Sequence, residues 1–211
     1  MTQHAPLFIV LLPVSAALLC MLFSRIQKNL GSWIVIASIA GAFLSAVSSL
    51  QQVIADGGKA LHYWMGNWQP PLGIEFVIDP ISGALAVLIT FIALLGSFYS
   101  LPFVKEEGWL HIGGYYTLYG LMTVGMCGMV ITGDVFNLYV FLEVMSLSGY
   151  GLIAIGGKKS MLAAFRYLLI GTIGASLYLL GVGYMYALTG TLNMADMAVR
   201  AAEFLNYPLF A

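Results

Sequence analysis

Long apolar runs separated by short polar segments dominate the pattern along the chain. Six runs reach the roughly 20 mostly apolar residues that a helix needs to cross the hydrocarbon core. They cover residues 6–23, 32–55, 80–100, 113–132, 135–155 and 162–188. A membrane β-barrel would instead show alternating segments of about ten residues. The pattern predicts an all-α polytopic membrane protein with about six transmembrane helices.

The chain divides into two predicted parts. We expect a six-helix transmembrane domain over residues 1–188 and a short tail over residues 189–211. Gly190 ends the last apolar run, Asn193 can cap a following helix, and Asp196 lies three residues later in its first turn. That helix is too short and too polar to span, so we expect it to lie amphipathically along the outer surface.

Composition excludes several classes of protein. Hydrophobic residues make up 61% of the 211 positions and charged residues only 8%, whereas a soluble domain carries about 25% charged residues. This excludes a soluble enzyme and a disordered chain. The net charge of −1 offers no basic surface, so we expect no nucleic-acid partner.

Basic residues favour one side of the membrane. Loops on that side contain Arg25, Lys28, Lys105, Lys158 and Lys159, and the opposite side contains Lys59 and Arg200. Basic loops stay in the cytoplasm. The distribution therefore predicts a multi-pass protein of the plasma (inner) membrane with its N-terminus outside.

The connector over residues 56–79 is rich in aromatic residues and proline. Trp64 and Trp68 predict an anchor at the outer interface. Asp79 followed by Pro80 predicts the N-cap and first residue of the third helix. A catalytic role for Asp79 is the alternative to capping.

Two ionisable side chains lie well inside predicted spans, Glu143 in the fifth and Arg166 in the sixth. Ionisable groups at such depth are costly and indicate functional sites. Glu143 lies about 18 Å from the inner end of its helix, near the middle of the bilayer. Tyr139, Ser146 and Tyr150 share its helix face. This polar stripe predicts contact with protein or water rather than lipid.

Two interpretations of Glu143 remain open. Desolvation favours the neutral form of a carboxyl group and a nearby cation favours the charged form, so the site can bind and release a proton. Alternatively, Glu143 is a neutral hydrogen-bonding group that holds helices together. Arg166 lies about 10 Å short of Glu143 along the membrane normal. We expect it either to couple with Glu143 or to extend to the cytoplasmic interface.

Other chemistry is not predicted. The three histidines, His4, His62 and His111, lack the spacing of metal ligands, and no glycine-rich phosphate loop is present. We expect no metal, no cofactor and no catalytic or redox centre in this chain.

The run Gly133–Glu143, continuing through Ser146 to Gly151, resembles the glutamate-bearing helix of antiporter-like membrane subunits. That family covers Mrp-type multisubunit cation/proton antiporters, membrane-bound hydrogenases and the membrane arm of respiratory complex I. Three further stretches carry the resemblance, over residues 64–74, 163–167 and 189–196. The first and last look most like the D-type member of the Mrp antiporter complexes.

The resemblance implies that Glu143 is a buried carboxylate that pairs with a lysine on a neighbouring helix and gates proton movement. Relatives usually have further spans that carry essential lysines, whereas the last lysine here is Lys159. Arg166 stands where many relatives have lysine, and arginine does not release a proton. We therefore expect the N-terminal portion of the antiporter-like fold, completed by another chain that supplies the lysine-bearing helices.

The expected function is a membrane subunit of a multisubunit Na⁺/proton antiporter. Its expected partners are other integral membrane subunits, the lipid bilayer, H⁺ and Na⁺. One alternative is a proton-pumping subunit in the membrane arm of an NADH:quinone oxidoreductase-like or hydrogenase complex. Another is a purely structural membrane scaffold.

Overall fold

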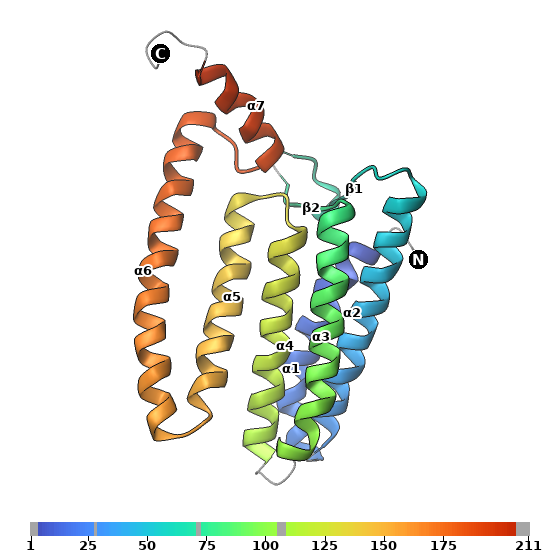
Figure 1. The fold of residues 1–211 in the computed structure, drawn as a ribbon, viewed down its shortest axis with the longest axis vertical. Helices are drawn as coiled ribbons and strands as arrows, with labels where there is room; N and C mark the ends of the chain where they lie inside the picture. Colours follow the sequence, from blue (N-terminus) through green and yellow to red (C-terminus); the bar gives the residue numbers. More distant parts are fainter. Residues whose placement is uncertain (1–3, 28, 71–72, 105–108, 206–211) are drawn as a thin grey trace.

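The computed structural model describes residues 4–27, 29–70, 73–104 and 109–205. The described residues form a bundle of long helices with a small β-hairpin and a short helix at one end (Figure 1). We call this end the hairpin end. Lys28 and Lys105, which contribute to the predicted orientation, lie outside the described residues.

Six helices are long and apolar enough to cross a membrane. They are α1 (Ala5–Ile26), α2 (Leu30–Ala55), α3 (Pro80–Val104), α4 (Trp109–Ile131), α5 (Val135–Ala154) and α6 (Lys158–Thr189). The predicted fold class and all six spans are confirmed. The largest differences are of four residues: α3 ends four residues after its predicted span, and α4 and α6 each begin four residues before theirs. The first two residues of α6, Lys158 and Lys159, can extend that helix because their charged ends reach water.

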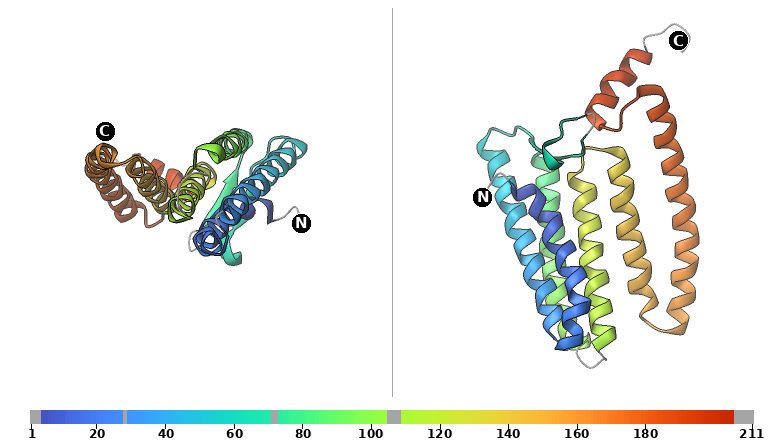
Figure 2. Two further views of the ribbon diagram at one scale, coloured as in Figure 1. Left: turned by 90° about the horizontal axis from the view of Figure 1, so that it is seen from below. Right: turned by 180° about the vertical axis from the view of Figure 1, so that it is seen from behind.

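The long helices form a core of four and a row that extends from it. Helices α1 to α4 pack against one another, α5 packs on α4, and α6 packs on α5 (Figure 2). Fully buried side chains such as Ile9, Ile39 and Ile131 lie in the four-helix core. By contrast, α6 exposes large apolar side chains, including Ile170 and Ile173. In a membrane, such a surface meets lipid or another subunit.

The connector between α2 and α3 folds as a β-hairpin, which the sequence pattern did not predict. Strand β1 (Leu61–Trp64) pairs antiparallel with β2 (Glu75–Ile78), and the 3₁₀ turn η2 (Met65–Asn67) follows β1. Phe76 and Ile78 are buried and belong to the apolar core between the helices. The hairpin therefore closes one end of the bundle.

Asp79 caps α3, as predicted. The backbone N–H of Ser82 donates to Asp79 Oδ1 at 2.6 Å, and the backbone N–H of Asp79 donates to Ser82 Oγ at 2.8 Å. These reciprocal bonds form a capping box. The hydrogen bonds from Ser82 hold the pKa of the Asp79 carboxyl below its usual value.

We expect Asp79→Ala to lower the free energy of unfolding by about 1 kcal/mol, the usual effect of losing an N-cap. Because the pKa of Asp79 is lower in the folded state, the contribution of Asp79 to stability is fully present above its pKa in the unfolded chain. This contribution is lost as the pH falls through the pKa in the folded protein. Thermal unfolding in detergent at neutral and acidic pH measures this, with Asp79→Asn as the control that retains an oxygen acceptor. A deficit that is equal at both pH values would contradict the assignment.

Helix α7 (Met194–Leu205) follows α6 after a short linker. Asn193 Oδ1 accepts a hydrogen bond of 3.0 Å from the backbone N–H of Asp196, so the predicted cap is confirmed. Arg200, which lies one helical turn after Asp196, forms an ion pair with it at 3.0 Å. The division into parts at residue 188 and the position of α7 on the membrane surface stay predictions.

Candidate functional site

The first turn of α5 is held by a set of polar contacts. Asp134 Oδ1 accepts a hydrogen bond of 2.7 Å from the backbone N–H of Asn137, whose side-chain amide donates to Thr132 Oγ1 at 3.0 Å. The backbone N–H of Val135 donates to the carbonyl of Leu192 at 3.0 Å. Burial raises the pKa of the Asp134 carboxyl, against the opposing effect of the bond from Asn137. The start of α5 is thus tied to both the α4–α5 turn and the α6–α7 linker.

One face of α5 is seated on glycines of α4. A Cβ atom added at Gly125 would lie 2.6 Å from the backbone nitrogen of Met145 and 2.7 Å from the carbonyl oxygen of Phe141. A Cβ atom at Gly128 would collide with the ring of Phe141. Small residues allow helix backbones to approach this closely. The α5 face that bears Phe141 and Met145 is therefore fixed against α4.

The polar stripe predicted on α5 lies along α6. Near one end, the ring of Tyr139 stacks on Tyr178, with centroids 6.4 Å apart and planes 5° from parallel. Near the other end, the ring of Tyr150 meets Tyr167 edge-on at 4.8 Å. Because Tyr139 and Tyr150 share one helix face, that face is turned toward α6.

Glu143 and Ser146 lie on this face between the two tyrosine contacts, and both are half-buried. Glu143 is about 16 Å from the end of α5 at Ala154, which places it near the middle of a helix of 20 residues. Neither of the two ion pairs formed by the described residues includes Glu143. The site is therefore a mid-span carboxyl group in a hydroxyl-bearing stripe, without a cation from the described part of the chain.

Arg166 lies away from Glu143. It is exposed on α6 and directly precedes Tyr167, which contacts Tyr150. Since Tyr150 follows Glu143 by seven residues, Arg166 is about 10 Å further from the hairpin end than Glu143. Coupling through water and extension to the interface both stay predictions for Arg166.

Sequence reasoning missed the buried carboxyl group of Glu75 on β2, which is 5% exposed. Its Oε1 accepts a hydrogen bond of 2.6 Å from Asn193 Nδ2, and His62 Nδ1 lies 3.1 Å from its Oε2. The available signal was the short β-rich run from Ile74 to Ile78 between turn residues, which is typical of a strand. Among the described residues, no group of three His, Cys, Asp or Glu side chains could hold a metal ion.

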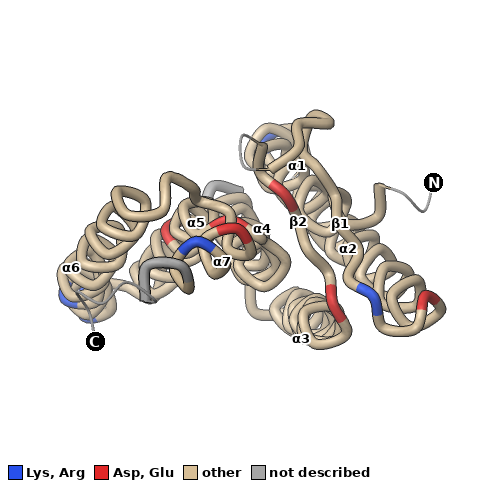
Figure 3. Tube along the Cα trace, turned by 90° about the horizontal axis from the view of Figure 1, so that it is seen from above, with Lys and Arg blue, Asp and Glu red and all other residues tan. Residues whose placement is uncertain are grey.

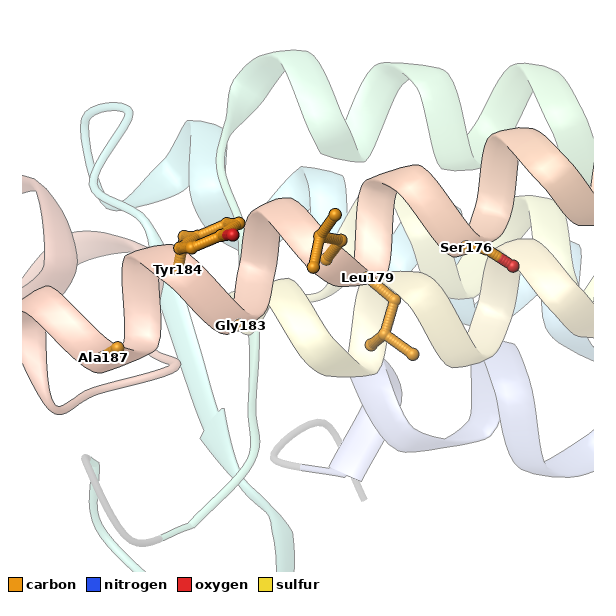
Figure 4. Close-up of a pocket in the computed structure, with 6 residues that line it drawn as sticks. Ser176, Leu179, Gly183, Tyr184 and Ala187 are labelled. Carbon is orange, nitrogen blue, oxygen red and sulfur yellow. The ribbon is translucent and has the colours of Figure 1, made fainter.

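The far side of α6 carries an open hollow of about 650 Å³ (Figure 4). All of its lining residues belong to this one helix: Ser176, Leu179, Leu180, Gly183, Tyr184 and Ala187. Ser176 and Tyr184 place hydroxyl groups in this exposed surface. The helix that faces Glu143 thus presents a mostly apolar surface with two hydroxyl groups to its surroundings.

Fold and site together define a polytopic helical membrane protein in which Glu143 is the acidic group at mid-span among the described residues. The profile of the NADH:quinone oxidoreductase/Mrp antiporter transmembrane family matches residues 132–210. The chain belongs to this family of antiporter-like membrane subunits, which confirms the resemblance carried by the glutamate-bearing helix.

Relatives come from both branches of the family. The N-type subunit of NADH-quinone oxidoreductase from Desulforudis audaxviator is 43% identical over 99% of this chain and 42% of its own length. The D-type subunit of the Na⁺/H⁺ antiporter from Bacillus subtilis is 32% identical over 92% of this chain and 38% of its own length. The chain thus spans about two fifths of the length of these curated relatives.

Solved structures of membrane complexes also contain chains that are similar to this one. A chain of the archaeal membrane-bound sulfane sulfur reductase, a respiratory membrane complex, matches with a TM-score of 0.87 and 31% identity, over 95% of this chain and 40% of that one. A chain of the Mrp complex from Dietzia matches with a TM-score of 0.77 and 25% identity, over 97% of this chain and 40% of that one. Both are chains of multisubunit membrane complexes.

Proposed function

We propose that this chain is a membrane subunit of a multisubunit monovalent cation/proton antiporter in which Glu143 carries the proton. The observation that carries the proposal is the mid-span carboxyl group on the α5 face turned toward α6, between two tyrosine contacts. The D-type relatives support the function, since their names give Na⁺/H⁺ and K⁺/H⁺ exchange. Of these ions we propose Na⁺.

In the proposed mechanism, Glu143 alternates between a protonated and a charged state. A proton carrier has to bind and release its proton, and an approaching cation favours release. Neither of the two ion pairs among the described residues includes Glu143. We therefore propose that a partner membrane protein of the complex supplies the cation, on a lysine-bearing helix. The hydroxyl groups of Tyr139, Ser146 and Tyr150 then line the proton's route along α5.

The test is cation-dependent proton movement in energised inverted vesicles that contain the complete complex. A pH-sensitive dye should report proton movement when Na⁺ is added, and vesicles without the complex should show none. A response to K⁺ alone would show that K⁺ rather than Na⁺ is the exchanged ion. No response to either ion would overturn the antiporter assignment.

A second candidate function is proton pumping in the membrane arm of a redox-driven complex. The 43% identity with the N-type oxidoreductase relative and the match to a respiratory membrane complex favour it. Co-purification of iron–sulfur or nickel subunits would support this function. A third possibility, a structural scaffold, predicts that changes at Glu143 disturb assembly rather than transport.

We propose that the hairpin end faces the outside of the plasma membrane. The described basic residues at the opposite end are Arg25, Lys158 and Lys159, and basic loops stay in the cytoplasm. Seen from the hairpin end, acidic positions lie on β2 and beside α2, α3, α4 and α7, and basic positions lie beside α2 and α7 (Figure 3). The N-terminus of α1 lies at this same end (Figure 1).

Thiol labelling tests this orientation. We expect a membrane-impermeant maleimide to label Lys59→Cys in intact cells and Lys158→Cys only after lysis. The native Cys20 and Cys127 are buried, so the unmodified chain should give little background. The reverse labelling pattern would overturn the orientation.

A further inference from the structure

Glu75 joins three segments of the chain at the hairpin end. Its side chain accepts a hydrogen bond from Asn193 in the α6–α7 linker and lies beside His62 on β1. Its backbone carbonyl accepts a hydrogen bond of 3.0 Å from the N–H of Gly133 in the α4–α5 turn. One residue of the hairpin thus contacts the segment that precedes α5 and the segment that follows α6.

The turn and the linker are also bonded to each other. The backbone N–H of Val135 donates to Leu192 at 3.0 Å, and that of Met194 donates to Gly133 at 2.9 Å. A Cβ atom added at Gly133 would lie 3.0 Å from the Cγ and 3.3 Å from the Oε1 of Glu75. The Glu75 side chain therefore packs directly on the backbone from which α5 starts.

Apolar packing alone does not account for a carboxyl group at this place. Burying a carboxylate is unfavourable unless hydrogen bonds compensate for the lost water. A bond from an amide to a carboxylate is stronger than one between neutral groups. The short bond between Glu75 and Asn193 thus holds the linker in one position, and the linker in turn holds the first turn of α5.

We propose that Glu75 is a positioning residue for Glu143: it fixes where α5 begins, and hence the height of Glu143 opposite α6. This inference rests on the proposed function of Glu143. Glu143 follows Val135 by eight residues on an unbroken helix, so a displaced first turn displaces the carboxyl group. A misplacement of about 1 Å is enough to reduce a rate on the order of a hundredfold.

The test compares Glu75→Ala with Glu75→Gln in the complete complex. Alanine removes the acceptor used by Asn193, whereas glutamine retains an oxygen acceptor but has no charge and carries no proton. We expect Glu75→Ala to reduce cation-dependent proton movement at least on the order of tenfold. Glu75→Gln should stay within about twofold of the unmodified complex. Asp56→Ala, an exposed carboxylate at the same end, is the matched control and should change nothing.

Amide hydrogen exchange gives a second readout that does not depend on transport. The amides of Val135 and Met194, which bond across the turn and the linker, should exchange faster in Glu75→Ala and at the normal rate in Glu75→Gln. If Glu75→Ala does not assemble, Asn193→Ser removes the same bond from the other side, while a serine hydroxyl can still cap α7, and should show the same two effects.

Two results would overturn the proposal. Loss of transport in Glu75→Gln equal to that in Glu75→Ala would mean that the charge of Glu75 matters rather than its bond. Unchanged exchange at Val135 in Glu75→Ala would mean that Glu75 does not hold α5. Amide hydrogen exchange reports on the placement of α5 alone, whereas transport by Glu143→Gln reports on the proposed function alone. A failure of this proposal is therefore distinguishable from a failure of the proposed function.

Discussion

Glu143→Gln is expected to abolish cation-dependent proton movement while the complex still assembles. Glutamine has nearly the same shape as glutamate, so the packing of α5 on α6 is retained, but its amide cannot bind and release a proton. Loss of a proton-transfer group costs about 10²- to 10⁴-fold in rate. We therefore expect the vesicle signal to fall by at least about a hundredfold.

The control for this prediction is Asp56→Asn, the same carboxyl-to-amide change at an exposed position outside the spans. Assembly is measured by co-purification of the partner subunits. Normal transport by an assembled Glu143→Gln complex would remove Glu143 from the mechanism. Loss of the assembled complex would instead favour the structural role, in which Glu143 acts as a hydrogen-bonding group between helices.

The parts of the fold that depend on local chemistry were predictable from the sequence. The six spans follow from the length of apolar runs, because lipid forces each crossing segment to satisfy its own backbone as a helix. The caps at Asp79 and Asn193 follow from residues only three positions apart. The stripe of Glu143 follows from helical spacing, which places Tyr139 and Tyr150 on its face.

The parts that depend on distant segments were not predictable. A β-rich run marks the strand that bears Glu75, but the run does not reveal its pairing with β1 or its contact with the helices. Glu75 finds its partner Asn193 across 118 positions, so nothing near Glu75 in the sequence reveals the bond. Helical spacing also shows which residues share a face with Glu143, but only the ring contacts identify α6 as the helix opposite that face.

Gly125→Ala is expected to destabilise the packing of α5 against α4. The added Cβ would meet two backbone atoms, the nitrogen of Met145 and the carbonyl oxygen of Phe141. Backbone atoms cannot rotate aside as a flexible side chain would, so α5 has to move away from α4. Overpacking of this kind costs about 1–3 kcal/mol. Thermal unfolding of the purified complex measures the loss.

The matched control is Gly114→Ala on the same helix, where the added Cβ would meet nothing within 4 Å. Alanine is a better helix former than glycine by about 1 kcal/mol, so this variant should be as stable as the unmodified chain or more stable. Because Met145 follows Glu143 by two residues on α5, displacement in Gly125→Ala should also lower proton movement. Equal stability of Gly125→Ala and Gly114→Ala would show that α5 is not seated on these glycines, and the fixed position of the Phe141 and Met145 face against α4 would lose its support.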